Sequence, residues 1–149
     1  MFRTLDIKLI HFCQTISIPL ARLALFIIFF WFGILKVIDL SPASPLVEKL
    51  FNETVSFVSF PTFIVLFGLF ECLIGILFLI HGAERVVIPL LLFHLITTVI
   101  PLFLLSAITW TGFMVPTLEG QYIIKNILII AAAITIAAHL HPLPRAKSS

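Results

Sequence analysis

Four long apolar runs dominate the chain and predict four membrane-spanning helices, at about residues 18–38, 61–81, 86–105 and 122–139. A helical run of about 20 apolar residues is long enough to cross the hydrocarbon core of a bilayer. The connection HGAER between the second and third runs is so short that these two spans must form an antiparallel hairpin. The predicted fold class is therefore all-α, an integral membrane four-helix bundle that forms one domain over residues 1–149.

The connection between the first two spans has a helical pattern of its own. In DLSPASPLVEKLFNETVSFVSF, Ser44 can cap a helix with Pro45 at its first position and Glu48 in its first turn. Apolar residues then recur at helical spacing on one face, among them Leu50 and Phe51. We expect a short amphipathic helix that lies on the membrane surface or dips into it. The alternative is an ordered loop.

Composition supports a membrane location and argues against several other classes of protein. The chain is 61% hydrophobic and only 11% charged, whereas a soluble domain carries about 25% charged residues. Its net charge of +2 is small and its basic residues are scattered, so we expect no nucleic-acid partner. Cys13 and Cys72 lie far apart without a CxxC motif, which argues against a disulfide and a thiol oxidoreductase.

The basic residues predict the orientation in the membrane. Cytoplasmic flanks of membrane proteins are enriched in Lys and Arg. The N-terminal segment carries Arg3 and Lys8, the second connection carries Arg85, and the tail carries Arg145 and Lys147. The other connections offer only Lys49, apart from lysines at the ends of the spans. We therefore expect both termini in the cytoplasm.

Two ionisable residues lie at similar depth in the second and third spans. Glu71 is about ten residues, and His94 about nine residues, from the ends of the spans that meet in the hairpin. At about 1.5 Å per residue both lie roughly 14 Å from that membrane edge, so a contact between them is feasible. Ionisable residues inside a span usually face the bundle interior. The contact is either a proton-handling or cofactor-binding site, or a bond that fixes packing. Gly68, Cys72 and Gly75 share one face, where small residues let another helix approach.

A second set of charged residues collects near the opposite membrane edge. Lys36 and Asp39 end the first span, Glu119 precedes the fourth, and Lys125 lies one turn inside it. These groups can pair with one another or bind an anionic ligand, and the lysines can also simply extend to the headgroups. Trp31 precedes Lys36 by five positions, with Gly33 between them, and the glycine would allow a ring and a charge to approach. We therefore expect a candidate polar cluster that would bind a cofactor, made of Glu71, His94, Lys36, Lys125 and Trp31.

The histidines suggest a haem site only weakly. His81 and His139 end their spans at the same membrane surface, and two imidazoles facing a shared cavity can hold a b-type haem. Histidines near lipid headgroups are common without any ligand, and we do not expect a haem. No spacing typical of a metal site is present, so no metal is expected.

Three short motifs together resemble those of the DoxX-like membrane proteins. They are WFGILK in the first span, FECLIG in the second and GQYIIKN at the start of the fourth. This bacterial and archaeal group includes the DoxD and RclC/YkgB branches, and the resemblance extends from about Arg22 to Ala133. The positions that match are Gly33 and Lys36, Glu71 and Gly75, and Lys125 with Asn126. The family often has aspartate where this chain has Asn126, which puts an ion-pair role for Lys125 in doubt.

The resemblance implies a four-helix bundle in the bacterial inner membrane, with a theme of redox and oxidative-stress physiology. Some members of the group are linked to quinone-dependent sulfur oxidation or to complexes with redox enzymes. We therefore expect a small accessory subunit, with a quinone as candidate cofactor, a redox-enzyme subunit as candidate protein partner and a homo-oligomer as a further candidate assembly. The alternatives are a non-catalytic membrane scaffold or assembly partner, and a proton or small-anion conduit formed by an oligomer.

Overall fold

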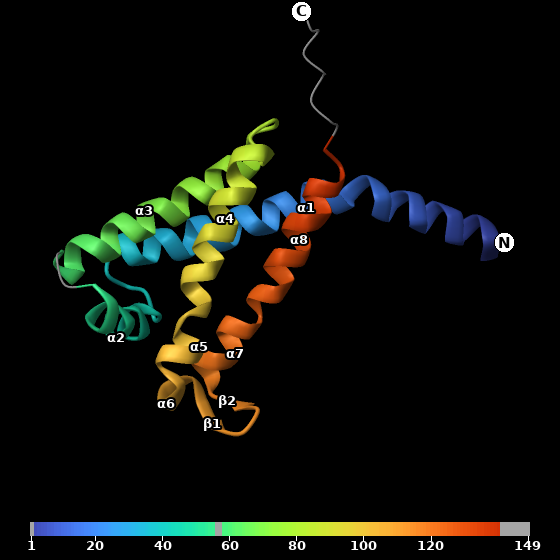
Figure 1. The fold of residues 1–149 in the computed structure, drawn as a ribbon. Coiled ribbons are helices and arrows are strands. Elements are labelled where there is room, and N and C mark those ends of the chain that lie inside the picture. Colours follow the sequence, from blue (N-terminus) through green and yellow to red (C-terminus); the bar gives the residue numbers. More distant parts are fainter. Residues whose placement is uncertain (1, 56–57, 141–149) are drawn as a thin grey trace, which may run out of the picture.

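The structure is a computed structural model that describes residues 2–55 and 58–140 (Figure 1). Among these residues, four helical segments are long and apolar enough to cross a membrane: Arg3–Val37, Phe60–Leu79, Glu84–Leu104 and Leu118–Ala138. The prediction of an all-α membrane bundle with four spans is therefore confirmed. Two residues used to predict the orientation, Arg145 and Lys147, lie outside the described residues.

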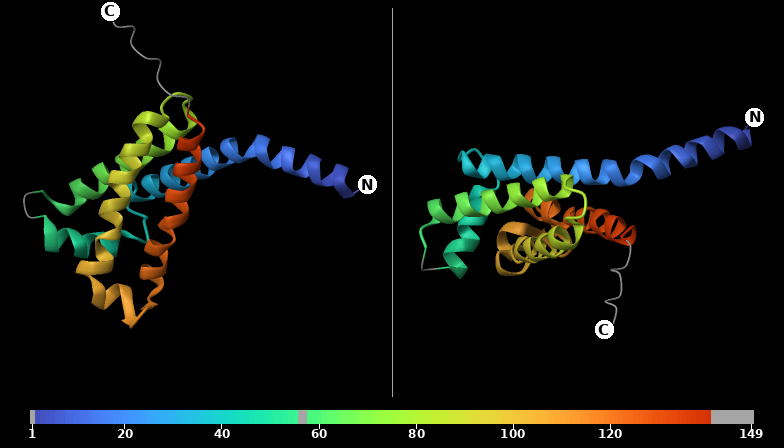
Figure 2. Two further views of the ribbon diagram at one scale, coloured as in Figure 1. Left: turned by 45° about the vertical axis from the view of Figure 1, so that its right-hand side comes forward. Right: turned by 90° about the horizontal axis from the view of Figure 1, so that it is seen from above.

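The bundle is built from two pairs of helices. The first pair is α1 (Phe2–Val37) and α3 (Phe60–Leu79), which lie side by side along most of α3. The second pair is α4 (Glu84–Val99) and α8 (Asn126–Ala138), which crosses the first pair obliquely (Figures 1 and 2). The core lies where the four helices meet, and its buried residues are Leu25, Phe29, Ile74, Phe78, Val87, Leu91, Leu95, Ala133 and Ile136.

Glycine lets α1 and α3 approach closely. A Cβ atom built on Gly33 would lie 2.6 Å from the carbonyl oxygen of Gly68, and one on Gly68 would lie 2.6 Å from the carbonyl oxygen of Gly33. A Cβ on Gly75 would lie 2.8 Å from the backbone nitrogen of Phe30. The prediction that the small residues of α3 receive another helix is thus confirmed, and α1 is that helix.

The predicted amphipathic helix after the first span is present as α2 (Ser44–Thr54). Its Phe51 is buried against α3, with ring centroids 4.8 Å from that of Phe63 and 5.7 Å from that of Phe60. The predicted cap is wrong by one residue. Ala43 is the N-cap and Ser44 is already inside the helix, because Ser41 and Ala43 form the preceding turn.

The third span is interrupted before Pro101 and the fourth span at Lys125, so each consists of two helices. The proline of α5 (Pro101–Leu104) ends α4 because a proline inside a helix cannot donate the i→i−4 hydrogen bond. The short helices α5 and α6 (Ser106–Thr109) lead into a hairpin of β1 (Trp110–Gly112) and β2 (Val115–Pro116), which the sequence did not predict. The fourth span then begins with α7 (Leu118–Ile124), because Thr117 caps it by accepting a bond from the Gly120 nitrogen at 3.1 Å.

The first half of α1 stands apart from the bundle. Residues 3–15 are exposed, and the helix projects well beyond the other spans (Figure 1). Pro19 lies in α1 near the point where the helix enters the bundle. The sequence places the start of the membrane span at residue 18, and the structure adds a helical extension before it.

Candidate functional site: a buried ion cluster

Three helices bring Lys36, Glu71 and His94 together inside the bundle. The Lys36 Nζ lies 2.6 Å from Oε2 of Glu71, and the His94 Nε2 lies 3.4 Å from Oε1 of the same carboxylate. At most 7% of each of these side chains is exposed. Lys36, Glu71 and His94 are called the buried ion cluster below. The contact predicted between Glu71 and His94 is confirmed.

Local helix geometry explains why Lys36 joins this cluster. Side chains on a helix lean toward its N-terminus. The Lys36 side chain therefore leans back along α1 into the bundle, and the Glu71 side chain leans in the opposite direction along antiparallel α3. The contact of Gly33 with Gly68 brings the two helices close enough for an ion pair at 2.6 Å. Lys36 does not stay at the membrane edge with Asp39, which is exposed.

Aromatic rings surround the buried ion cluster. The His94 ring stacks on Phe67 with centroids 5.1 Å apart, and it meets the edge of Phe29 at 5.3 Å. The Lys36 Nζ lies 5.7 Å from the centroid of Phe67. These rings exclude water and contribute cation–π attraction, so the ionic interactions act in a low-dielectric environment.

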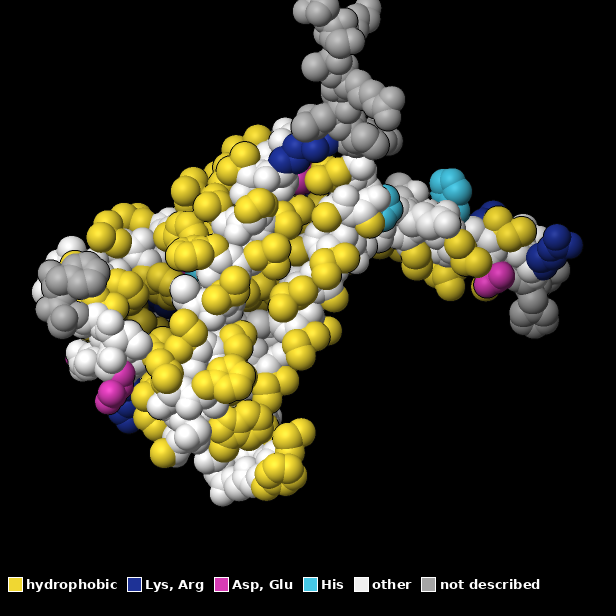
Figure 3. Space-filling model, in the orientation of Figure 1, with side chains coloured by type: hydrophobic (Ala, Val, Ile, Leu, Met, Phe, Trp, Pro, Cys, Tyr) yellow, Lys and Arg dark blue, Asp and Glu magenta, His cyan; other side chains and the backbone are white. Residues whose placement is uncertain are grey.

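One polar atom of the buried ion cluster is without a partner among the described residues. The Nδ1 of His94 is buried and makes no hydrogen bond. A buried polar atom left unpaired costs about 1 to 3 kcal/mol, so such an atom calls for an explanation. Figure 3 shows a hollow between α3 and α4, beside α2, in which Lys or Arg and His side chains are visible.

The structure leaves the other two members of the candidate polar cluster outside. The Trp31 side chain is 62% exposed on α1, and Lys125 is exposed between α7 and α8. Glycine at position 33 serves the contact with α3 and does not bring a ring toward Lys36. Asn126, next to Lys125, points into the bundle, where its Nδ2 donates to Oγ1 of Thr98 at 3.2 Å. A ligand-binding role for Trp31 or Lys125 stays a prediction.

Sequence reasoning missed the aromatic surroundings and the partner of Lys36. Phe67 lies four residues before Glu71, on the same face of α3, and this spacing was a usable signal. With 16 phenylalanines in the chain, however, no pattern singled out Phe29, the ring on α1 that reaches His94.

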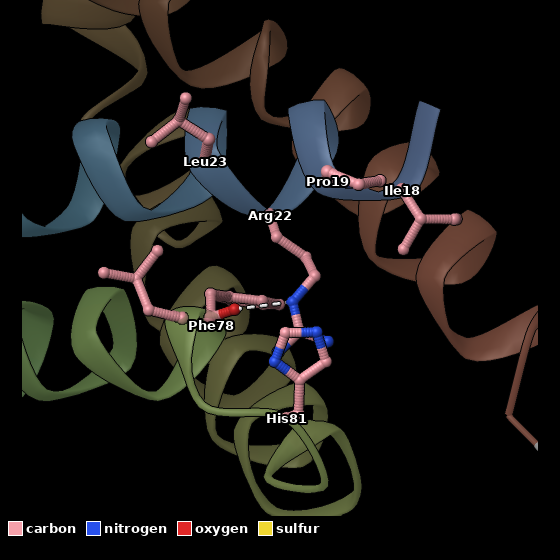
Figure 4. Close-up of a pocket in the computed structure, with 7 residues that line it drawn as sticks. Ile18, Pro19, Arg22, Leu23, Phe78 and His81 are labelled. Atoms are coloured by element: carbon pink, nitrogen blue, oxygen red, sulfur yellow. Dashed lines mark hydrogen bonds between the residues drawn. The ribbon is translucent and has the colours of Figure 1, made fainter. Parts of the chain in front are cut away.

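A second buried ion pair fastens the turn between α3 and α4. Arg22 on α1 pairs with Glu84, and each of these two side chains is 9% exposed. The Arg22 Nε also donates to the carbonyl of Phe78 at 2.8 Å (Figure 4). Its Nη2 donates to the carbonyl of Ile80, also at 2.8 Å. Arg22 thus ties α1 to the carbonyls at the end of α3, where the helix leaves carbonyl groups without partners of its own, and to the turn that follows.

The Arg22 side chain also lines a pocket of about 300 Å³ beside the turn, together with Pro19, Phe78 and His81 (Figure 4). Each nitrogen of its guanidinium already donates to α3 or to Glu84. His139, the second histidine of the haem hypothesis, does not line this pocket, and its Nδ1 lies 2.8 Å from the carbonyl oxygen of Thr135. Among the described residues, no group of three or more His, Cys, Asp or Glu can hold a metal ion.

We expect Arg22→Met to lower the free energy of unfolding by about 1.5 to 3 kcal/mol, because it removes charge-assisted hydrogen bonds that fasten the α3–α4 turn. Cys72 is buried and Cys13 exposed, so reaction of Cys72 with a thiol-specific dye during heating, in a Cys13→Ser background, reports unfolding. The exposed Arg3→Met is the matched control. Equal melting of both variants would contradict the assigned role of Arg22.

Comparisons of the chain with known proteins do not decide its family. No family model, curated protein or solved structure matches it. The four spans show a multi-pass membrane protein by helix length and hydropathy. The buried ion cluster is the feature on which a more specific function can be proposed.

Proposed function

We propose that the chain is a DoxX-like protein of the bacterial inner membrane, with both termini in the cytoplasm, that acts as a small accessory subunit in quinone-linked redox or oxidative-stress physiology. The observation that carries this proposal is the buried ion cluster with its unpaired His94 Nδ1. Two of the positions that resemble the family, Lys36 and Glu71, are direct partners in it. The proposal therefore rests on residues that meet in space as well as on short motifs.

The side chains around His94 have the chemistry that a quinone requires, and the quinone would have to separate the rings that now pack against the imidazole. The rings of Phe67, Phe70 and Phe29 can hold an apolar ring, and the unpaired Nδ1 can hydrogen-bond to an oxygen on it. A bound quinone would supply two-electron, two-proton redox chemistry, with its electrons exchanged with a partner redox protein. This chain's residues bind and orient the ring, exclude water and hold protons at the His94 imidazole and the Glu71 carboxylate.

His94→Phe tests this proposal because it removes the unpaired nitrogen and keeps a ring between the phenylalanines. The Lys36–Glu71 ion pair remains in His94→Phe and only Oε1 of Glu71 loses its partner, so the variant should fold. We expect native mass spectrometry of protein gently extracted from its own membranes to detect a bound quinone in the wild type and to find several-fold less in His94→Phe.

The matched control is His139→Phe, at an exposed histidine, which should retain quinone as the wild type does. Equal quinone content in all three proteins, or none in the wild type, would contradict quinone binding at His94. A haem or a redox-enzyme subunit in the wild-type spectrum would identify a different cofactor or the protein partner.

A second candidate function, a non-catalytic scaffold, is favoured by a separate observation. Both oxygens of Glu71 already have partners, one on α1 and one on α4. The carboxylate therefore joins three helices, which is sufficient reason for its presence in the membrane. If the chain is a scaffold, variants of the buried ion cluster should change stability and assembly. The wild-type protein should then contain no quinone.

A further inference from the structure

The first half of α1 is longer than a membrane span requires. The helix has 36 residues, which at about 1.5 Å each gives a length of roughly 54 Å. The hydrocarbon core is about 30 Å thick, which about 20 residues can cross. Residues 18–37 supply that length and pack in the bundle, so the residues before them must continue outside the hydrocarbon core.

The projecting segment, residues 3–17, is amphipathic. Leu5, Leu9, Phe12 and Ile16 follow one another at spacings of four, three and four residues, and therefore form one stripe. Thr4, Lys8, His11 and Thr15 form a neighbouring polar stripe with the same spacings. Ile7 and Ile10 lie outside the apolar stripe. Figure 3 shows hydrophobic side chains mainly along one edge of this helix and Lys, Arg and His side chains along the other.

The first three residues of this apolar stripe are not covered by the rest of the described chain, and Ile16 is half-buried. Leu5, Leu9 and Phe12 are between 58% and 68% exposed. Their helix leaves the bundle beside Pro19, whose missing N–H cannot bond to the Thr15 carbonyl. A helix freed of that bond can bend there and turn from the membrane normal toward the membrane plane.

We infer that residues 3–17 lie along the membrane surface as an interfacial helix that binds anionic lipid headgroups. The apolar stripe enters the boundary between headgroups and acyl chains, and Arg3 and Lys8, which outnumber the acidic Asp6, meet the lipid phosphates. The segment is continuous with a membrane span, which places it at the surface where that span begins. This inference requires the membrane location and is independent of the redox function.

The test uses the full chain in liposomes of phosphatidylcholine, with or without phosphatidylglycerol. One new cysteine replaces Leu9 or Phe12 on the apolar stripe, or Lys8 or His11 on the polar stripe, in a Cys13→Ser background in which the remaining Cys72 is buried. A nitroxide attached to each cysteine then reports collision with oxygen, which concentrates in lipid, and with a water-soluble nickel complex. We expect a several-fold higher oxygen-to-nickel ratio on the apolar stripe.

The anionic headgroups are tested by a charge change in the presence of the Leu9→Cys reporter. Arg3→Gln combined with Lys8→Gln should lower the ratio at position 9 and abolish its increase with phosphatidylglycerol, whereas the control Asp6→Asn should preserve that increase. High nickel accessibility on both stripes in both lipids would overturn the inference. Low accessibility to both reagents with spin–spin broadening would overturn it in favour of a contact with a second copy of the chain.

Discussion

Replacing Glu71 with leucine is expected to lower the free energy of unfolding by about 3 to 5 kcal/mol, which is the usual cost of breaking a buried ion pair. The variant leaves the Lys36 ammonium buried among phenylalanine rings, without its partner at 2.6 Å. It also removes the partner of the His94 Nε2. Heating with a thiol dye that reports exposure of Cys72, in a Cys13→Ser background, measures the loss.

A second substitution separates the unpaired charge from lost packing. Lys36→Met combined with Glu71→Leu removes both charges and fills similar volume, and such replacements of buried ion pairs are often neutral or stabilising. The double variant should therefore recover the part of the stability that Glu71→Leu loses through the unpaired Lys36 charge. The unpaired His94 Nε2 would account for a remaining loss of about 1 to 3 kcal/mol. A double variant as unstable as Glu71→Leu would show that Glu71 does not stabilise the protein through its ion pair with Lys36.

Gly33→Ala is expected to have the second largest effect, because its added methyl group has no space between α1 and α3. Its Cβ would lie 2.6 Å from the Gly68 carbonyl oxygen and 2.7 Å from Sγ of Cys72. Overpacking of a core typically costs about 1 to 3 kcal/mol. We expect the upper part of this range, because the closest atom belongs to the backbone and separating the helices also lengthens the Lys36–Glu71 ion pair.

The matched control for Gly33→Ala is Gly112→Ala in the hairpin, where a Cβ would meet nothing within 4 Å. The yield of monodisperse protein and its melting temperature measure both effects. The control should be neutral, and Gly68→Ala should be as unstable as Gly33→Ala because the two glycines contact each other. Wild-type stability of Gly33→Ala would contradict the close approach of α1 and α3.

The spans and the contact of Glu71 with His94 could be predicted because they depend on hydropathy and on depth along a short hairpin. Equal distance from the turn is sufficient to align the two residues, and HGAER leaves little freedom in the alignment. The short helix α2 was likewise visible in its apolar spacing and in Pro45.

The partner of Lys36 could not be predicted from the depth of its backbone alone. A lysine side chain spans more than one helical turn, so a residue at the end of α1 reaches a carboxylate deeper in the bundle. The lean of helical side chains toward the N-terminus gives the direction of that reach. The pairing of Arg22 with Glu84 was missed for a related reason, since a basic residue at the membrane edge is equally consistent with a headgroup contact.

The hairpin depends on interactions that leave little trace in the sequence. Trp110 anchors the hairpin by donating from Nε1 to the carbonyl of Leu102 at 3.0 Å. Met114 adopts a left-handed conformation with φ of 58°, which is unusual for a residue other than glycine. Neither residue type is a standard turn signal, so the sequence pattern did not indicate a hairpin.

The most direct test of the proposed function is survival under oxidant stress of a strain in which the Lys36→Met, Glu71→Leu double variant replaces the wild-type protein. The variant should be present in the membrane at close to the wild-type level, because its charges are removed as a pair. The proposal predicts that survival falls to that of a strain lacking the protein. Wild-type survival at equal protein level would contradict a redox role for the buried ion cluster and favour the scaffold function.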